Sequence, residues 1–316
     1  MIDKYLRACR KWTDIFLIAG ILSVVVTILA ALVGAVILKI PVISHLIVSI
    51  TQSETLTVFM RDYLLFIGIW VVVILIILIF PGNRPMLKAF GFNGKKNTLP
   101  GLGIGLLLGF CANGFCVLMS CLMKDIKLSY FGFEPLILIA FLISVFIQSG
   151  AEELADRLYL YQKLRRRYKN PWVAILFNAL VFMSLHLLNP GFTALAGAQI
   201  FIVGVVCSLF VYYYDGLWIA IGFHTAWNYT QNLIFGLPNS GIVSEYSIFT
   251  LEAASARNGL FYNVNFGVEG SIGASIVIAL IGVYMIVRNK GKKENTDYWA
   301  DMEAEKLSSV KDDTNS

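Results

Sequence analysis

Hydrophobic residues form long stretches without any charged side chain, and they do not alternate regularly with polar residues. These stretches cover residues 15–38, 63–83, 97–123, 135–151, 170–214, 216–244 and 270–287. Nearly all are long enough to cross a bilayer, which takes roughly 20 helical residues. The stretch 170–214 is about twice that length, and Asn189-Pro190-Gly191 near its middle predicts a break between two helices. The pattern therefore predicts an all-α polytopic membrane protein with about eight transmembrane helices.

Composition and charge agree with a membrane protein. The 316 residues are 58% hydrophobic and 14% charged, whereas soluble domains are about 45–50% apolar. When successive connections are assigned to alternate sides, nineteen lysines and arginines lie on the side of the N-terminus and five on the other. The positive-inside rule then places both termini in the cytoplasm. Since no basic segment is interleaved with stacking aromatic residues, we expect no nucleic-acid partner.

The sequence predicts one membrane domain followed by a polar tail. We predict a single transmembrane domain over residues 1–288, in which the first span is a retained anchor because it is longer than the apolar region of a secretory signal. Residues 289–316 are polar and charged, which predicts a disordered cytoplasmic tail without chemistry. The longest connection, residues 237–269, is either a lid over an opening or a linker, and we favour a linker. The five cysteines are interpreted as packing residues.

Three glycines lie four residues apart in the third apolar stretch. Gly101, Gly105 and Gly109 share one face of a helix. This spacing is typical of helices that pack closely within a membrane. A phosphate-binding loop is not indicated, because the preceding strand and the lysine of such a loop are missing. We therefore predict that these glycines serve helix packing.

Ionisable residues are rare inside the apolar stretches, and each of them is a functional candidate because a charge in a membrane is costly. The fourth stretch, 135–151, runs directly into Glu152 and Glu153. Glu153 and Arg157 are four residues apart, so they can form an ion pair on one helix face. Glu152 points about 100° away from Glu153 and has no cation four residues later. This isolated carboxylate is a candidate general base or acid.

Two of the three histidines also lie inside apolar stretches. His224 and Asn228 are four residues apart and share a helix face. At 1.5 Å per residue, Glu152, His186 and His224 lie roughly 15, 21 and 12 Å from the expected cytoplasmic helix ends. These depths overlap once helices tilt, so the three helices can converge on one polar cavity. His45, near the outer end of the first span, is expected at the surface.

Three motifs resemble the CAAX prenyl protease and bacteriocin-processing (CPBP, or Abi) family of intramembrane proteases. They are Glu-Glu-x-x-x-Arg at Glu152, Glu153 and Arg157, Phe-x-x-x-His at Phe182 and His186, and His-x-x-x-Asn at His224 and Asn228. The resemblance covers residues 135–236, which would be the catalytic core. It implies an endopeptidase that cleaves a membrane-associated peptide or protein within the lipid bilayer, most readily in a bacterial cytoplasmic membrane.

The resemblance also implies roles for these residues. Glu152 with His186 would hold and deprotonate a water, and His224 with Asn228 would stabilise the oxyanion. Glu153 would brace the site or share in catalysis, with Arg157 and Phe182 as support. The family has been described both as glutamate-dependent and as zinc-dependent. Zinc would bind His186 and His224, although the metal-free account is favoured because no His-Glu-x-x-His motif is present.

Two functions of other classes stay open. The first is a non-catalytic membrane scaffold or bacteriocin-immunity protein that has the same fold and uses the polar cluster for helix packing. The second is a proton-coupled transporter, suggested by carboxylates and histidines within the spans. The transporter is the least favoured, because the sequence lacks inverted repeats and paired broken helices. Neither the substrate nor its cleavage site can be inferred from the sequence.

Overall fold

The computed structural model describes residues 4–91 and 97–315, and 72% of it is helical. Five helical segments are long and apolar enough to cross a membrane: 16–38, 54–79, 99–122, 135–167 and 194–214. The helices are α1 (Phe16–Leu38), α2 (Pro41–Thr51), α3 (Glu54–Leu64), α4 (Ile67–Ile79), α5 (Leu87–Phe90), α6 (Leu99–Leu122), α7 (Pro135–Glu153), α8 (Tyr161–Arg167), α9 (Pro171–Ser184), α10 (Ala194–Tyr214), α11 (Leu217–Tyr229), α12 (Ile272–Arg288) and α13 (Ala300–Asn315). The prediction of a helical multi-pass membrane protein is confirmed.

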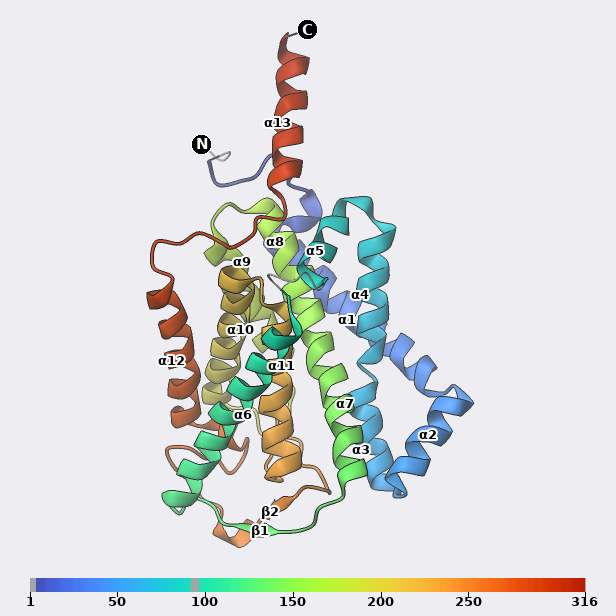
Figure 1. Ribbon diagram of the computed structural model, residues 1–316, viewed down its shortest axis with the longest axis vertical. Coiled ribbons are helices and arrows are strands. Elements are labelled where there is room, and N and C mark those ends of the chain that lie inside the picture. The colour runs from blue at the N-terminus through green and yellow to red at the C-terminus, as the bar shows by residue number, and fades with distance from the viewer. Residues whose placement is uncertain (1–3, 92–96, 316) are drawn as a thin grey trace.

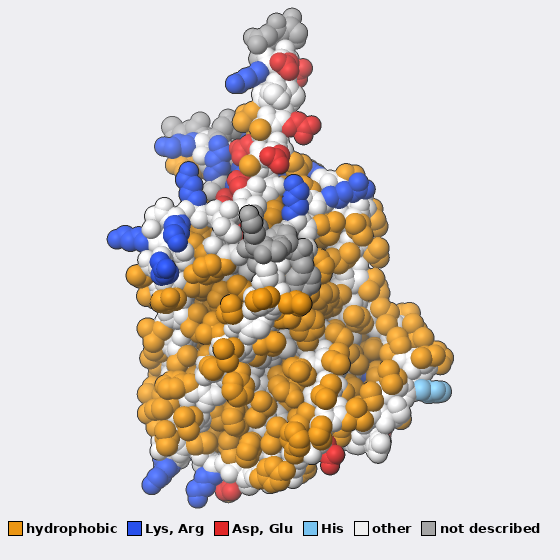
Figure 2. Space-filling model, in the orientation of Figure 1, with side chains coloured by type: hydrophobic (Ala, Val, Ile, Leu, Met, Phe, Trp, Pro, Cys, Tyr) orange, Lys and Arg blue, Asp and Glu red, His pale blue; other side chains and the backbone are white. Residues whose placement is uncertain are grey.

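The longer helices run side by side along the long axis of the molecule, and both termini lie at the same end (Figure 1). At the opposite end, β1 (Leu128–Tyr130) pairs with β2 (Phe249–Leu251) as a short antiparallel sheet. Hydrophobic side chains cover the surface between two ends where the lysines and arginines gather (Figure 2). Such a belt is expected of a protein whose solvent is lipid over its middle and water at its two ends.

The second candidate span begins earlier than the sequence predicts. The charge-free criterion starts it at residue 63, but α3 begins at Glu54 after the N-cap Ser53. Arg61 and Asp62 therefore lie inside the segment 54–79. The Arg61 guanidinium donates a hydrogen bond of 2.6 Å to the Ser44 hydroxyl on α2, which gives this charge a polar partner. A charge that finds such a partner does not end a span, which is why the prediction was wrong here.

The predicted glycine packing of α6 is confirmed. A Cβ atom at Gly105 would collide with the carbonyl oxygen of Ile219 on α11, and one at Gly109 would collide with that of Phe223. Helix α11 therefore lies directly against the backbone of α6. Because α11 also carries His224 and Asn228, these glycines set where both side chains lie. By contrast, a Cβ at Gly103 would meet nothing within 4 Å.

The variant Gly105→Ala is expected to destabilise the protein, whereas Gly103→Ala is not. The added methyl group at position 105 would push α6 and α11 apart, and such overpacking costs about 1–3 kcal/mol. Thermal unfolding of the two variants in the same detergent measures the difference. Equal midpoints for Gly105→Ala and Gly103→Ala would contradict close packing between α6 and α11.

The helix that carries Glu152 and Glu153 continues beyond α7 without a break. It passes through η4 (Leu154–Leu160), which is wound as a π-helix, and ends in α8. Short π-helical segments occur frequently at functional sites. The winding changes directly after Glu153, so the side chains that follow are rotated relative to those of a regular α-helix. The Glu153–Arg157 pair nevertheless forms across this junction, at 3.1 Å.

The end of this helix is held by a buried ion cluster. Arg166 donates to both Asp14 carboxylate oxygens at 2.6 Å, and the Lys163 ammonium lies 3.1 Å from the same carboxylate. Burial alone would raise the pKa of Asp14, but Arg166 and Lys163 together hold this pKa below its ordinary value. The ionised cluster ties α8 to the segment that precedes α1. It thereby fixes one end of the helix that bears Glu152 and Glu153.

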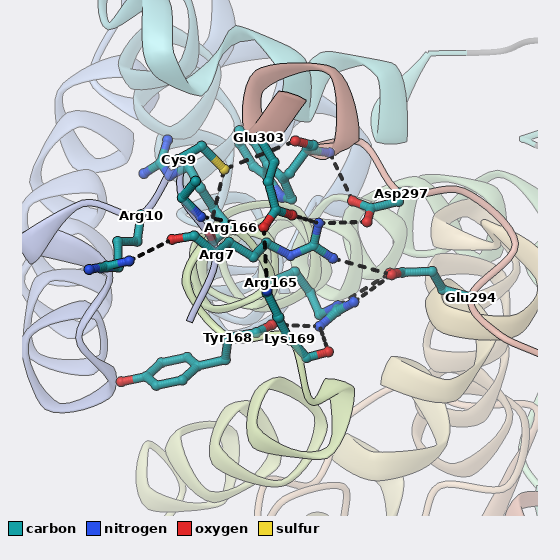
Figure 3. Close-up of polar contacts among 12 residues, drawn as sticks. Arg7, Cys9, Arg10, Arg165, Arg166, Tyr168, Lys169, Glu294, Asp297 and Glu303 are labelled. Carbon is teal, nitrogen blue, oxygen red and sulfur yellow. Dashed lines mark hydrogen bonds and ion pairs between the residues drawn. The ribbon is translucent and has the colours of Figure 1, made fainter. Parts of the chain in front are cut away.

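The prediction of a disordered tail over 289–316 is wrong for its described part. Arg165 donates hydrogen bonds of 3.2 and 2.5 Å to the Glu294 carboxylate (Figure 3). Arg7 reaches Asp297 at 2.5 Å and Glu303 at 3.3 Å. The acidic residues of the tail thus neutralise buried arginines at the cytoplasmic end expected from the sequence. Low hydrophobicity predicts disorder only where the charges lack such partners.

Candidate active site

A cavity of about 320 Å³ lies among the candidate spans, and most of the predicted residues line it. Its walls come from α1, α3, α7, η4, α9, α11 and the connection after α11. The predicted residues on its surface are Glu152, Phe182, His186, His224 and Asn228. Three helices that are distant in sequence therefore bring these side chains to one place, as the similar depths predict.

The Glu152 carboxylate faces the cavity with one oxygen bound and one free of hydrogen bonds. Oε1 accepts a hydrogen bond of 2.6 Å from the Gln148 side-chain amide, one helical turn earlier on α7. Oε2 lies 3.6 Å from Nε2 of His224 and has no hydrogen-bond partner among the described residues. Buried polar atoms are normally hydrogen-bonded. This buried oxygen therefore remains an unused hydrogen-bond acceptor beside His224.

Glu153 connects His224 to Arg157. Its Oε1 atom lies 2.9 Å from Nδ1 of His224 and accepts a hydrogen bond of 3.1 Å from Arg157. Both Glu153 and Arg157 are fully buried, and the guanidinium also donates to the Gly204 carbonyl oxygen and lies 4.7 Å from the centre of the Phe182 ring. A carboxylate at Nδ1 fixes the orientation of an imidazole. Nε2 of His224 is thereby turned toward Glu152.

Phe182 lies between the two histidines. Its ring centre is 4.8 Å from that of His186 and 5.9 Å from that of His224. Nδ1 of His186 lies 2.8 Å from the Phe182 carbonyl oxygen. A carbonyl oxygen only accepts, so Nδ1 carries the proton, and Nε2 of a neutral His186 ring is left as an acceptor. Nε2 of His224 lies 3.6 Å from the Glu152 carboxylate, whereas the resemblance implies that Glu152 and His186 act together on a water.

The Asn228 amide spans the polar wall of the cavity. Its Nδ2 atom donates at 3.3 Å to the Gln148 side-chain oxygen and, at the same distance, to the Ser149 hydroxyl. Its Oδ1 atom accepts a hydrogen bond of 3.1 Å from Asn239. The amide nitrogen is thus on the side of α7, where Gln148 and Ser149 accept from it.

Several residues around the cavity were missed by sequence reasoning. Asp62 was expected to precede its span. Gln148 is uncharged and was therefore not selected, although its position four residues before Glu152 places it on the same helix face. The interpretation of 237–269 as a linker is wrong, because Asn239 and Ser240 line the cavity. Glu269 of the same connection is 5% exposed and bonds Asn239 at 3.2 Å.

The donor set does not fit a zinc site. No group of three or more His, Cys, Asp or Glu side chains is arranged to hold a metal ion within residues 4–91 and 97–315. Nδ1 of His224 bonds Glu153 and Nδ1 of His186 bonds a backbone carbonyl, so the Nε2 atoms could serve as two ligands, and it is a third ligand that is not arranged beside them among the described residues. Catalytic zinc usually takes three protein ligands. We therefore derive no chemical step through a metal.

Comparison with known families bears directly on this cavity. Residues 134–230 match the family model described as "Type II CAAX prenyl endopeptidase Rce1-like". This segment is Rce1-like. The predicted resemblance to CAAX proteases is confirmed, and the Rce1-like segment contains all of the predicted site residues from Glu152 to Asn228. No curated protein and no solved structure gives a match. The similarity to a CAAX protease family therefore rests on residues 134–230.

Proposed function

We propose that this protein is an intramembrane endopeptidase that hydrolyses a peptide bond in a membrane-associated peptide or protein. The observation that carries the proposal is the pairing of a free Glu152 oxygen with His224 at 3.6 Å, inside a cavity that the Rce1-like segment largely forms. A carboxylate and an imidazole at one cavity surface provide a proton acceptor and a hydrogen-bond donor for the same bound group.

The proposed reaction uses water as the nucleophile. Glu152 accepts a proton from the water as the water oxygen attacks the carbonyl carbon of the scissile bond, and Nε2 of His186 holds the water by accepting its other hydrogen. Nδ2 of Asn228 and a protonated Nε2 of His224 donate to the oxyanion that forms. Glu153 opposes the positive charge of His224. Glu152 then returns the proton to the leaving amine, and the carbon–nitrogen bond breaks.

The proposal is tested in cells by comparing wild type with Glu152→Gln, His186→Ala and His224→Ala at matched expression. Each variant removes a different group from the proposed reaction, so all three are expected to accumulate the same precursor in the membrane proteome. If all three variants have the proteome of the wild type, the polar cluster is structural and the alternative of a scaffold or immunity protein is supported.

We further propose eight spans with both termini in the cytoplasm of a bacterial cell. Five candidate spans, the shorter apolar helices α9 and α12, and α11 with its π-helical extension Thr230–Ile234 support this count. An even number agrees with the termini at one end of the molecule (Figure 1). Labelling of an engineered cysteine at either terminus by a membrane-impermeant reagent from outside intact cells would contradict this topology.

Substrates with a basic residue near the scissile bond are expected to be preferred. Asp62 lines the cavity, and its neighbour Arg61 is turned toward Ser44. The described residues of the cavity wall include no lysine or arginine, so its charge is complementary to a cation. Asp62→Lys should lower cleavage of a peptide with lysine relative to one with glutamate by roughly tenfold, which corresponds to about 1.4 kcal/mol.

The effect of Asp62→Lys is measured in proteoliposomes with two fluorogenic peptides, one that contains lysine and one that contains glutamate. Glu54→Lys is the matched control, since it makes the same change at the exposed start of the same helix. It should leave the ratio between the two peptides unchanged. If Asp62→Lys and Glu54→Lys give the same ratio, Asp62 does not select the substrate charge.

A further inference from the structure

The connection after α11 reaches into the cavity and is fastened there by a buried carboxylate. Asn239 and Ser240 lie near the start of this connection and line the cavity. Glu269 lies at its far end, in the short helix Val268–Gly270, and is 5% exposed. The connection is about 30 residues long, and loops of this length are often functional. Its two ends thus meet beside Asn228.

Three hydrogen-bond donors from two parts of the chain surround the Glu269 carboxylate. Oε1 accepts bonds of 3.2 Å from the Trp227 indole nitrogen and of 3.2 Å from Nδ2 of Asn239. Oε2 accepts a bond of 2.7 Å from the backbone nitrogen of Ser240. All three partners donate, so the position requires a group that only accepts, as an ionised carboxylate does.

Asn239 connects Glu269 to Asn228 by hydrogen bonds. The same Nδ2 atom that bonds Glu269 also donates to Oδ1 of Asn228 at 3.1 Å. An asparagine amide can otherwise turn over and exchange its oxygen and nitrogen. With Oδ1 held by Asn239, the Nδ2 group of Asn228 is directed toward α7 and the space beside Glu152.

We propose that Glu269, acting through Asn239, is a positioning residue that holds the Asn228 amide with its nitrogen toward the substrate carbonyl. This inference rests on the proposed function, because it assigns the orientation of a group that the proposed hydrolysis uses. Glu269 itself touches neither the substrate nor the water. It lies outside the Rce1-like segment at 134–230, so the connection after α11 completes a site that this segment begins.

The hydrogen bonds that link Glu269 to Asn228 through Asn239 predict that the orientation of Asn228 depends on pH. Burial raises the pKa of Glu269 to about 7, against the opposing effects of the Ser240 backbone amide, the Trp227 indole and the charge of His224, while Glu152 raises it further. Below that pH Glu269 is protonated and presents an O–H group toward three donors. The orientation of Asn228 should therefore be lost as the pH falls through about 7.

The test compares Glu269→Gln with Glu252→Gln in the full chain in proteoliposomes. Glu252 is an exposed residue of the same connection and carries the same charge, so it is the matched control. Glu269→Gln should lower kcat roughly 10- to 100-fold, less than the roughly 10²- to 10³-fold loss of a whole oxyanion donor, with KM nearly unchanged. The loss of activity on the acidic side of pH 7 should disappear.

A second variant tests the path through Asn239. Asn239→Ala removes the donor to Asn228 without changing charge, and it should lower kcat as Glu269→Gln does. The two effects should not add in the double variant, because both act on the same amide. Additive effects, or a Glu269→Gln enzyme with the kcat and pH profile of Glu252→Gln, would overturn the proposal. If Glu269→Gln does not fold, the Asn239→Ala result decides.

An NMR readout separates this inference from the proposed function. The side-chain amide resonance of Asn228, assigned by its loss in Asn228→Ala, should shift as the pH crosses about 7 in the wild type and stay fixed in Glu269→Gln. This shift requires no substrate. If the wild type hydrolyses no peptide but the resonance titrates, the proposed function fails and the linkage stands. A resonance that titrates equally in both proteins refutes the linkage.

Discussion

Substituting Glu152 by glutamine is expected to lower the rate of peptide hydrolysis by about 10²- to 10⁴-fold, the range that general acid–base groups contribute. Glutamine has nearly the same shape as glutamate, and its side-chain oxygen can still accept the hydrogen bond from Gln148. It cannot accept a proton from water. The protein should therefore keep its fold and its substrate binding, so that kcat falls while KM changes little.

For Glu152→Gln, the rate of peptide cleavage in proteoliposomes measures the expected fall in kcat. The melting temperature measures whether the fold is kept. Glu134→Gln is the matched control, because Glu134 precedes the same helix and its side chain is exposed. It should retain the wild-type rate. A Glu152→Gln enzyme that still cleaves at more than half of the wild-type rate would exclude Glu152 as the general base.

The hydrogen bonding of the Glu152 carboxylate also favours the proposed enzyme over a scaffold. A polar cluster that served only helix packing would bind its polar atoms to one another, because unpaired polar groups in a membrane are costly. Glu153 and Arg157 do form such a buried pair. Among the described residues, Glu152 has a carboxylate oxygen without a hydrogen bond and lines a cavity of about 320 Å³, whereas Glu153 and Arg157, which also have one unpaired atom each, do not line it. This arrangement lowers stability and supports the proposal that the cavity binds a polar group.

Local patterns in the sequence predicted the local geometry of the site. The spacing of four residues paired Glu153 with Arg157, and the same spacing of Gly105 and Gly109 predicted the close helix packing that the contact of α6 with α11 confirms. Both results follow from the helical repeat alone, which is fixed wherever a helix forms. Charge-free length likewise predicted the helical membrane architecture, although it began the second span too late at residue 63.

Contacts between distant segments could not be predicted in this way. The sequence did not predict that helix packing brings Nε2 of His224 to within 3.6 Å of the Glu152 carboxylate. Glu269 reaches the site only because the connection after α11 folds back, and loop composition does not specify that path. Similarly, the charges of the tail suggested disorder until Arg7 and Arg165 were seen to pair with them. Each of these outcomes depends on which partner a charge meets in three dimensions.

Replacing Arg157 by methionine is expected to destabilise the folded protein by about 3–5 kcal/mol, the cost of leaving one partner of a buried ion pair alone. Methionine fills much of the space but leaves Glu153, which is fully buried, without its cation. The contacts of the guanidinium with the Gly204 carbonyl and the Phe182 ring are lost as well. Unfolding in a detergent micelle by a chemical denaturant measures the change.

Two further variants determine whether the loss comes from the uncompensated charge. Lys169→Met removes an ion pair with Glu303 whose lysine is 49% exposed and whose carboxylate still pairs with Arg7, so it should change stability by less than about 1 kcal/mol. Glu153→Gln/Arg157→Met removes both charges and should recover much of the stability that Arg157→Met loses. Activity should not recover, because Nδ1 of His224 then lacks its carboxylate. If Arg157→Met unfolds like Lys169→Met, the buried pair does not stabilise the site, and the orientation of His224 must depend on other contacts.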